Sequence, residues 1–437
     1  MHMHRKRNKE LGLLELVAIA LGGMVGGGIF TILGISVSMI GYLTPVAIII
    51  GGLIAALAAY SYVKLGVYYQ DQGATYSFFK KTYPTSRFWA SAIGWFIIFG
   101  YISTLALYAY TFSSYALSST ELAQNRWARK AIAIAVISLF TFINLWSVNG
   151  MGKIEDLMVY SKLIILALVS IVLMQNSTMD LGTLMHHVSL DAKHTSGFTI
   201  LIVASLTFVA YEGFQLVINA VNEMTHPEKN IPRAIYIAIS LAMLIYVVIS
   251  LAALLAIPTQ DIIQKKEYAL AAGAGHVLGP AGANLVILAA LLATSSAISG
   301  TVFGASRQMA VIAGDGYFPR WLSVRKNKSP QNAILAMAIM ASILVTIGGL
   351  ELILEFGSMT FLLVSLLMAM ANYKLRKQTH SSTFLTVLSI AGLAIGAALI
   401  IYYELTHQWT QMMAIFGLYL ALAFGAWIYA KKNKTQP

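Results

Sequence analysis

The stretch that decides the fold is Gly22-Gly23-Met24-Val25-Gly26-Gly27-Gly28-Ile29-Phe30, in the middle of an apolar run over residues 11–38. Five of the seven residues from 22 to 28 are glycine. Because glycine costs about 1 kcal/mol per residue in a helix interior, this cluster predicts two half-helices joined by open backbone. The competing interpretation is close helix packing through Gly22 and Gly26, but packing needs two glycines and not five.

The composition is that of an integral membrane protein. Hydrophobic residues make up 58% of the chain, charged residues 11%, and the mean hydropathy is +0.74. Charged residues separate apolar runs of about 20 residues, which is enough to cross a hydrocarbon core. We therefore predict an all-α integral membrane protein with twelve transmembrane helices, near 11–38, 43–68, 87–118, 128–149, 153–174, 196–221, 231–256, 280–309, 331–348, 352–373, 384–403 and 412–430.

The net charge of +12 is explained by topology rather than by nucleic-acid binding. With residues 1–10 and 431–437 both cytoplasmic, most of the 29 lysines and arginines fall on the inner side. This is the positive-inside bias that orients membrane proteins. The outer loop with Arg126, Arg129 and Lys130 runs against the rule. The basic N-terminus leads into a full-length span with no small-residue cleavage site, so we expect no signal peptide.

Several classes of function are disfavoured by what the chain lacks. It has no cysteine, which excludes disulfides, thiol catalysis and cysteine-bound metals. A membrane enzyme needs clustered catalytic groups, and a channel needs a continuous polar pore; only isolated polar residues occur at membrane depth. His186, His187 and His194 fall in the outer loop 176–196, where an exposed polar loop is favoured over a metal site. We expect no enzymatic activity, no cofactor and no metal.

Lys162 is the first polar anomaly within the membrane. It lies nine residues after Lys153, about 13 Å into the bilayer at 1.5 Å per residue. A lysine at that depth is costly and marks an ion or proton route by default. The competing interpretation is an ammonium that snorkels or forms a fixed structural pair.

Glu212 is the second anomaly, within Phe208-Val209-Ala210-Tyr211-Glu212-Gly213-Phe214-Gln215. A carboxylate beside a glycine at mid-span predicts a second discontinuous helix, whose polar face continues through Gln215 and Asn219. A protonated or paired structural glutamate is the alternative.

Smaller polar groups complete the picture. We predict an interfacial helix within 68–87, and cavity-lining positions or mere packing for the tyrosines of the third span, Tyr101, Tyr108 and Tyr110. In span eight, hydroxyls including Ser295 and Ser296 either coordinate a cation or bond back to their own helix.

The chain divides into two matching halves. Residues 11–174 (spans one to five) and 196–373 (spans six to ten) each begin with a broken-looking helix. Because five is odd, the halves have opposite topology, and inverted repeats with interrupted segments point to a midplane substrate site in secondary transporters. Spans eleven and twelve, 384–430, carry no charge at mid-depth and are predicted to be peripheral.

These motifs resemble a known family. The glycine stretch, Tyr211-Glu212-Gly213-Phe214, Asn230-Ile231-Pro232-Arg233-Ala234-Ile235 and Gly314-Asp315-Gly316-Tyr317-Phe318-Pro319 are similar to those of amino acid permeases of the amino acid–polyamine–organocation (APC) superfamily. The resemblance covers nearly the whole chain and implies the leucine-transporter fold with broken helices one and six. It is greatest to prokaryotic proton-coupled permeases of the ApcT type, which carry a lysine in span five.

The resemblance implies roles at individual positions. Amides of the glycine break would hold the substrate carboxylate, helped by the half-helix dipole, and carbonyls at both breaks would take the ammonium. Lys162 would replace the sodium ion of sodium-coupled relatives, near the Gly22 carbonyl and Ser295 or Ser296. Glu212 departs from the apolar residue common at its position. The predicted substrate-binding residues are Gly22, Gly23, Val25, Gly26, Gly27, Gly28, Tyr101, Phe208, Val209, Ala210, Tyr211 and Glu212.

We therefore expect a secondary transporter of the inner (plasma) membrane that imports amino acids by proton-coupled alternating access. The alternative within the class is an exchanger or importer of cationic amino acids or polyamines, with Glu212 as counter-charge. The expected partners are an amino acid substrate, protons and the lipid bilayer, with no nucleic acid; the sequence carries no signal for an oligomeric state.

Overall fold

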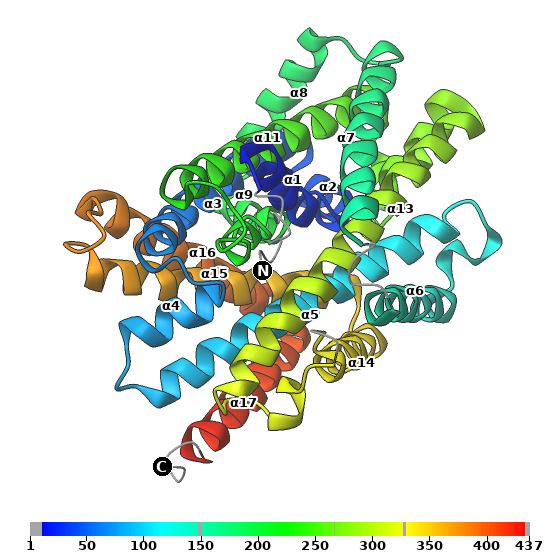
Figure 1. Ribbon diagram of the computed structural model, residues 1–437. Helices are drawn as coiled ribbons and strands as arrows, with labels where there is room; N and C mark the ends of the chain where they lie inside the picture. Colours follow the sequence, from blue (N-terminus) through cyan, green and yellow to red (C-terminus); the bar gives the residue numbers. More distant parts are fainter. Residues whose placement is uncertain (1–10, 147–150, 266, 327–328, 433–437) are drawn as a thin grey trace.

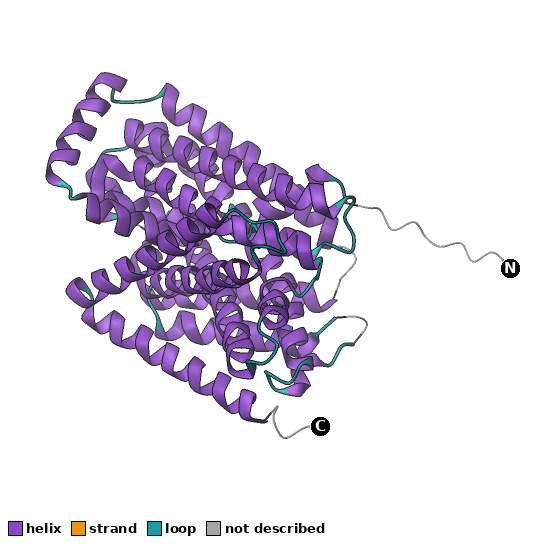
Figure 2. Cartoon of the chain, turned by 90° about the vertical axis from the view of Figure 1, so that its left-hand side faces the viewer, coloured by secondary structure: helices purple, strands orange, loops and turns teal. Residues whose placement is uncertain are grey.

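The computed structural model describes residues 11–146, 151–265, 267–326 and 329–432, and within them the regular structure is helical. Its helices pack around one another along most of their length (Figure 2). Their bounds are α1 Leu13–Met24, α2 Gly27–Ile40, η1 Gly41–Leu43, α3 Thr44–Tyr69, α4 Ala74–Thr82, α5 Arg87–Leu117, η2 Glu121–Gln124, α6 Arg126–Trp146, α7 Met151–Gln175, α8 Leu181–His194, α9 Gly197–Leu206, η3 Thr207–Tyr211, α10 Leu216–Asn219, α11 Pro227–Ala256, α12 Thr259–Gln264, α13 Ala269–Gly314, η4 Arg320–Ser323, α14 Gln331–Ile347, α15 Leu350–Leu375, α16 Thr383–His407 and α17 Trp409–Lys432.

The helices have the length and apolar composition of a multi-pass membrane protein. Among the described residues, ten segments are long and apolar enough to cross a bilayer, one of which covers α2 and α3 together. The shorter helices α1 and α14 are also apolar. The predicted all-α membrane fold is thus confirmed, while the count of twelve spans stays a prediction.

The first apolar run is interrupted where the glycines cluster. Helix α1 ends at Met24, and α2 begins at Gly27. Gly26 between them has a φ of −117° and a ψ of −142°, far from helical values. The predicted pair of half-helices is therefore present. Both lie among the longer helices α5, α7, α11 and α13 (Figure 1).

A second interruption follows α9. The chain tightens into the 3₁₀ turn η3, becomes extended at Glu212, and returns to helix only at α10. Gly213 has a φ of +125°, a conformation that other residues adopt only with strain. The glycine beside the mid-span carboxylate thus marks a discontinuous helix, as its position predicted.

The two interruptions touch backbone to backbone. A Cβ atom added to Gly213 would lie 2.7 Å from the carbonyl carbon of Gly23, and one on Gly28 would lie 3.0 Å from the Cα of Ala210. Glycine is therefore required for this approach as well as for the break. Gly22 and Gly26, the pair named by the close-packing interpretation, also leave little room: an added Cβ would lie 3.2 Å from Val159 Cγ2 and 2.7 Å from Ala297 Cβ, respectively, so close packing accompanies the break.

The structure corrects one expectation. The segment 176–196, predicted as a polar loop, contains the 14-residue helix α8, whose first amides are capped by the Asp180 carboxylate. An N-cap aspartate within polar sequence was the missed signal. Span eight, predicted at 280–309, is the part of α13 that follows the kink at Gly279 and continues to Gly314. A helix predicted within 68–87 is present as α4, and its interfacial position stays a prediction.

We expect Gly213→Ala to destabilise the fold strongly. The substitution combines a strained φ with a Cβ pressed against the backbone of α1, for which we expect a loss of about 2–4 kcal/mol. Thermal unfolding of the detergent-purified protein measures it. Gly392→Ala, in the interior of α16 with nothing within 4 Å of the added Cβ, is the control and should be as stable as wild type or slightly more stable, because alanine is favoured over glycine in a helix. Equal stability of the two variants would contradict the close approach.

Candidate functional site

The last carbonyl groups of α1 have lost their partners within the helix because of the break, and they receive hydrogen bonds from three other helices. Lys162 Nζ of α7 donates to Gly22 O at 3.0 Å, and the Tyr108 hydroxyl of α5 donates to Gly23 O at 3.1 Å. The Tyr246 hydroxyl of α11 lies 2.7 Å from Met24 O. A helix end buried in apolar surroundings needs such partners, because each unpaired carbonyl costs free energy.

Lys162 is fully buried, and its ammonium reaches the break. Its Nζ also lies 3.5 Å from the Ser296 hydroxyl of α13, at the upper limit for a hydrogen bond. Lys162 thus links α1, α7 and α13 at one point. Of the two serines proposed for this place, Ser296 is buried and in contact, whereas Ser295 is only partly buried and no hydrogen bond of its side chain is recorded among the described residues.

The beginning of α2 presents backbone amides to the same place. The amide of Gly26 donates to Met24 O at 2.9 Å, so it is already engaged. Gly27 and Gly28 are the first residues of α2, and the first amides of a helix have no acceptor within it. With the positive end of the helix dipole, these two amides are better placed than the Gly26 amide to receive an anion.

Tyr246 joins the two interruptions. Its hydroxyl lies 2.7 Å from Met24 O and 2.8 Å from Ala210 O, and the side chain is buried. A hydroxyl carries one proton, so it can donate fully to only one of these carbonyls at a time. One of the two carbonyl groups, Met24 O or Ala210 O, can therefore accept a hydrogen bond from another donor.

Glu212 is held by a short network of side chains. Gln215 Nε2 donates to Glu212 Oε1 and lies within 2.9 Å of the Tyr101 hydroxyl, while Gly213 N donates to Gln215 Oε1. Glu212 is 3% exposed, and among the described residues its Oε2 has no hydrogen-bond partner.

These groups surround a small central cavity. Its volume is about 10 Å³, which is room for about one water molecule and not for an amino acid. The chain has therefore closed around the site in this conformation. The lining residues are Gly23, Tyr101, Thr104, Tyr108, Glu212, Gly213, Leu216, Thr301, Ala305 and Phe361.

Comparison with known proteins agrees with this architecture. The family model for amino acid permeases matches residues 11–435. The chain belongs to the amino acid permease family. It is 28% identical over 433 residues to the inner membrane transport protein YbaT of Escherichia coli, covering 98% of both chains. It is 27% identical over 328 residues to the large neutral amino acids transporter small subunit 2 of Oryctolagus cuniculus, covering 72% of this chain and 60% of the relative.

A solved structure supports the fold alone. A manganese transporter of Eremococcus coleocola, in complex with an aromatic bis-isothiourea compound, aligns with a TM-score of 0.62 at 13% sequence identity, covering 99% of this chain and 96% of the other. Together with the apolar helices, these relatives indicate that the permease is a multi-pass membrane transporter rather than an enzyme, and that it belongs to the APC superfamily.

Most of the predicted residues lie close together in this permease. Several of them, however, make other contacts than those predicted. Val25, Phe208 and Val209 are buried among apolar side chains. Tyr211 is also buried, and its hydroxyl donates to Ile48 O of α3 at 2.8 Å. The carbonyls of Gly22 and Gly23, proposed to accept the ammonium, already accept hydrogen bonds from side chains.

Two partners of the break were not assigned to the site from the sequence. Tyr108 belongs to the group of span-three tyrosines proposed to line a cavity, and it does so beside Tyr101. Tyr110 instead borders a separate polar cavity. Tyr246 stands in the apolar helix α11, where nothing in the sequence distinguishes it from a packing residue.

We expect Tyr246→Phe to destabilise the permease by about 1–3 kcal/mol, the usual cost of leaving a buried polar group without its partner. Loss of the hydroxyl removes the donor shared by the two interruptions, with little change in side-chain volume. Thermal unfolding measures the effect. Tyr160→Phe in α7 is the control, because Tyr160 is 51% exposed. Unfolding temperatures that fall equally in both variants would show that the bridge contributes nothing.

Proposed function

We propose that this permease imports amino acids by proton-coupled alternating access, with Lys162 as the proton-coupling residue. The observation that carries the proposal is the buried Lys162 side chain, whose Nζ donates to Gly22 O at the end of a broken helix. Membership of the amino acid permease family supports an amino acid as substrate. An ionisable group inside the membrane belongs by default to an ion or proton pathway.

We propose that the substrate binds between the two interruptions. Its carboxylate would accept hydrogen bonds from the amides of Gly27 and Gly28, with Gly26 joining once its bond to Met24 O opens. Its ammonium would donate to carbonyls of the segment 208–211, including Ala210 O, which shares the Tyr246 proton. The amide end of α2 and the carbonyls of η3 thus match the two charges of an amino acid.

The proposed architecture is the leucine-transporter type, with twelve spans and a 5+5 inverted repeat of residues 11–174 and 196–373. It is supported by the position of the interruptions, one at the start of each half. We also propose the plasma (inner) membrane as the location, with both termini cytoplasmic, because this topology places most lysines and arginines inside.

The contacts of Lys162 support the proposed proton coupling. A charged ammonium makes stronger hydrogen bonds than a neutral group does, so the Gly22 carbonyl and the Ser296 hydroxyl hold its proton while α1, α7 and α13 stay together. When the helices separate, these acceptors move away and water reaches the amine. Release of the proton on the cytoplasmic side then completes the cycle.

We expect Lys162→Ala and the bulkier Lys162→Met to lose pH-driven accumulation in proteoliposomes while substrate binding persists within about tenfold. The reason is that Lys162 contacts Gly22 O at the end of α1 and does not line the central cavity. Accumulation of labelled amino acid under an imposed pH gradient measures coupling, and binding is measured separately. Lys193→Ala, on the exposed face of α8, should behave as wild type.

Uphill uptake that still followed the pH gradient in both Lys162 variants would contradict the coupling role of this residue. If instead both variants failed to bind any amino acid, the residue would serve the site's structure and not its coupling.

We expect Glu212→Gln to retain uptake of neutral amino acids to within about fivefold, because the change affects one hydrogen bond of about 1 kcal/mol. The bond at stake joins Glu212 Oε1 to Gln215 Nε2. Competition of labelled substrate with neutral amino acids, lysine, arginine and polyamines gives the profile of each protein. Selective loss of the cationic substrates in the variant would establish the alternative, in which Glu212 is a counter-charge.

A further inference from the structure

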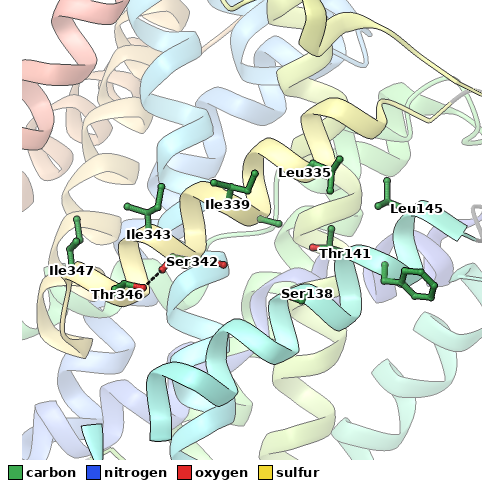
Figure 3. Close-up of a pocket in the computed structure, with 11 residues that line it drawn as sticks. Ser138, Thr141, Leu145, Leu335, Ile339, Ser342, Ile343, Thr346 and Ile347 are labelled. Carbon is green, nitrogen blue, oxygen red and sulfur yellow. Dashed lines mark hydrogen bonds between the residues drawn. The ribbon is translucent and has the colours of Figure 1, made fainter. Parts of the chain in front are cut away.

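A groove of about 570 Å³ runs between α6 and α14, away from the central cavity. Figure 3 shows its walls, with Ser138, Thr141 and Leu145 on α6 opposite a stripe of side chains on α14. That stripe runs from Leu335 to Ile347. The twelve residue-to-residue steps of this stripe correspond to about 18 Å, close to the thickness of one leaflet of a roughly 30 Å hydrocarbon core.

The surface of the groove is apolar although several lining residues carry hydroxyls. Ser138 and Thr141 donate to carbonyls of their own helix at 2.8 and 2.7 Å, and Thr346 donates to Ser342 O at 2.8 Å (Figure 3). The one donor proton of each of these hydroxyls is thereby used within the walls. Large apolar side chains on the rim face outward, with Phe142 57% and Ile343 53% exposed. A polar ligand would find few partners here, and a hydrocarbon chain would find many.

One end of the groove is positively charged. Lys130 Nζ donates to Thr346 O at 2.6 Å, which places its ammonium beside the last turn of α14. Arg126 lies one helical turn earlier on α6 and is exposed. Trp127, 75% exposed, lies beneath the Lys130 ammonium, whose Nζ is 5.4 Å from the ring centre. Tryptophan and basic residues at a helix end are typical of the membrane–water boundary.

The remaining charges near this end are largely paired or set back from the groove. Arg129 is buried and forms an ion pair with Glu267. Glu351 and Lys265 line a separate polar cavity, which Arg126 and Lys130 also border and which meets the groove at Ile347. Among the residues that the structure describes, Lys130 uses one of its three donors on Thr346 O, which leaves two for a ligand.

We infer that the groove binds one phospholipid with an anionic headgroup, its phosphate held by Arg126 and Lys130 and an acyl chain lying along α6 and α14. The combination of an apolar groove of leaflet length and a cationic end matches an amphiphile of that charge. It also accounts for the basic cluster on the side where the positive-inside rule predicts few lysines and arginines. A lipid bound there would contact helices that pack on α5, which carries Tyr101 and Tyr108.

Native mass spectrometry of the delipidated protein tests the inference. The probe is an equimolar mixture of phosphatidylglycerol and phosphatidylcholine with identical oleoyl chains. We expect wild type to retain one phosphatidylglycerol at least fivefold more often than phosphatidylcholine. The double variant Arg126→Gln/Lys130→Gln should retain the two lipids equally, and Ser138→Phe, which fills the groove, should retain neither above background.

Matched controls separate charge and bulk from the site. Lys193→Glu lowers the net charge by the same two units at an exposed position of α8, and Val387→Phe adds bulk to the 47% exposed face of α16. Both should retain phosphatidylglycerol as wild type does. Equal retention of the two lipids by wild type, or wild-type retention by Ser138→Phe, would overturn the inference. The inference would also be overturned if wild type formed a dimer without lipid and Ser138→Phe did not. That result would identify a second copy of the chain as the occupant of the groove.

Discussion

The structure depends on the contact between two interrupted helices whose backbones meet with no side chain between them. Gly23 lies against Gly213, and Gly28 lies against Ala210. Such an approach leaves no room for a Cβ atom on Gly23, Gly28 or Gly213, which explains why glycines occupy positions where they cost helical stability. The contact brings the carbonyl end of α1, the amide end of α2 and the turn η3 into one small volume.

Breaking two helices inside an apolar protein leaves backbone groups that need partners, and the partners come from helices around the break. Lys162, Tyr108 and Tyr246 reach the carbonyls of Gly22, Gly23 and Met24 from α7, α5 and α11. Each of these bonds ties α1 to a different neighbour. A change in the protonation of Lys162 would therefore change the strength of a hydrogen bond that holds α1 against α7. This is the physical basis of the proposed coupling.

The sequence predicts the parts of this arrangement that depart from ordinary membrane helices. Five glycines in seven residues, and a lysine and a glutamate at mid-span, are each costly enough to require a reason. The proximity of Lys162 to Gly22 and Ser296 was expected from the family resemblance and agrees with the structure. Tyr246 could not be predicted, because the sequence of an apolar helix does not show which acceptors a tyrosine hydroxyl will meet, and here they are carbonyls of two distant segments. The hydrogen bond from the Gly26 amide to Met24 O could not be predicted either, because it depends on local backbone angles that no residue type specifies.

Proton movement with substrate tests the central claim most directly. Wild-type permease is reconstituted in sodium-free liposomes that contain a pH-sensitive dye, with the membrane potential clamped at zero, and amino acid is added outside. Our account predicts acidification of the lumen that begins with amino acid entry, saturates with it, and is absent without substrate. Amino acid entry at the same rate with no acidification, or entry that requires sodium, would contradict it.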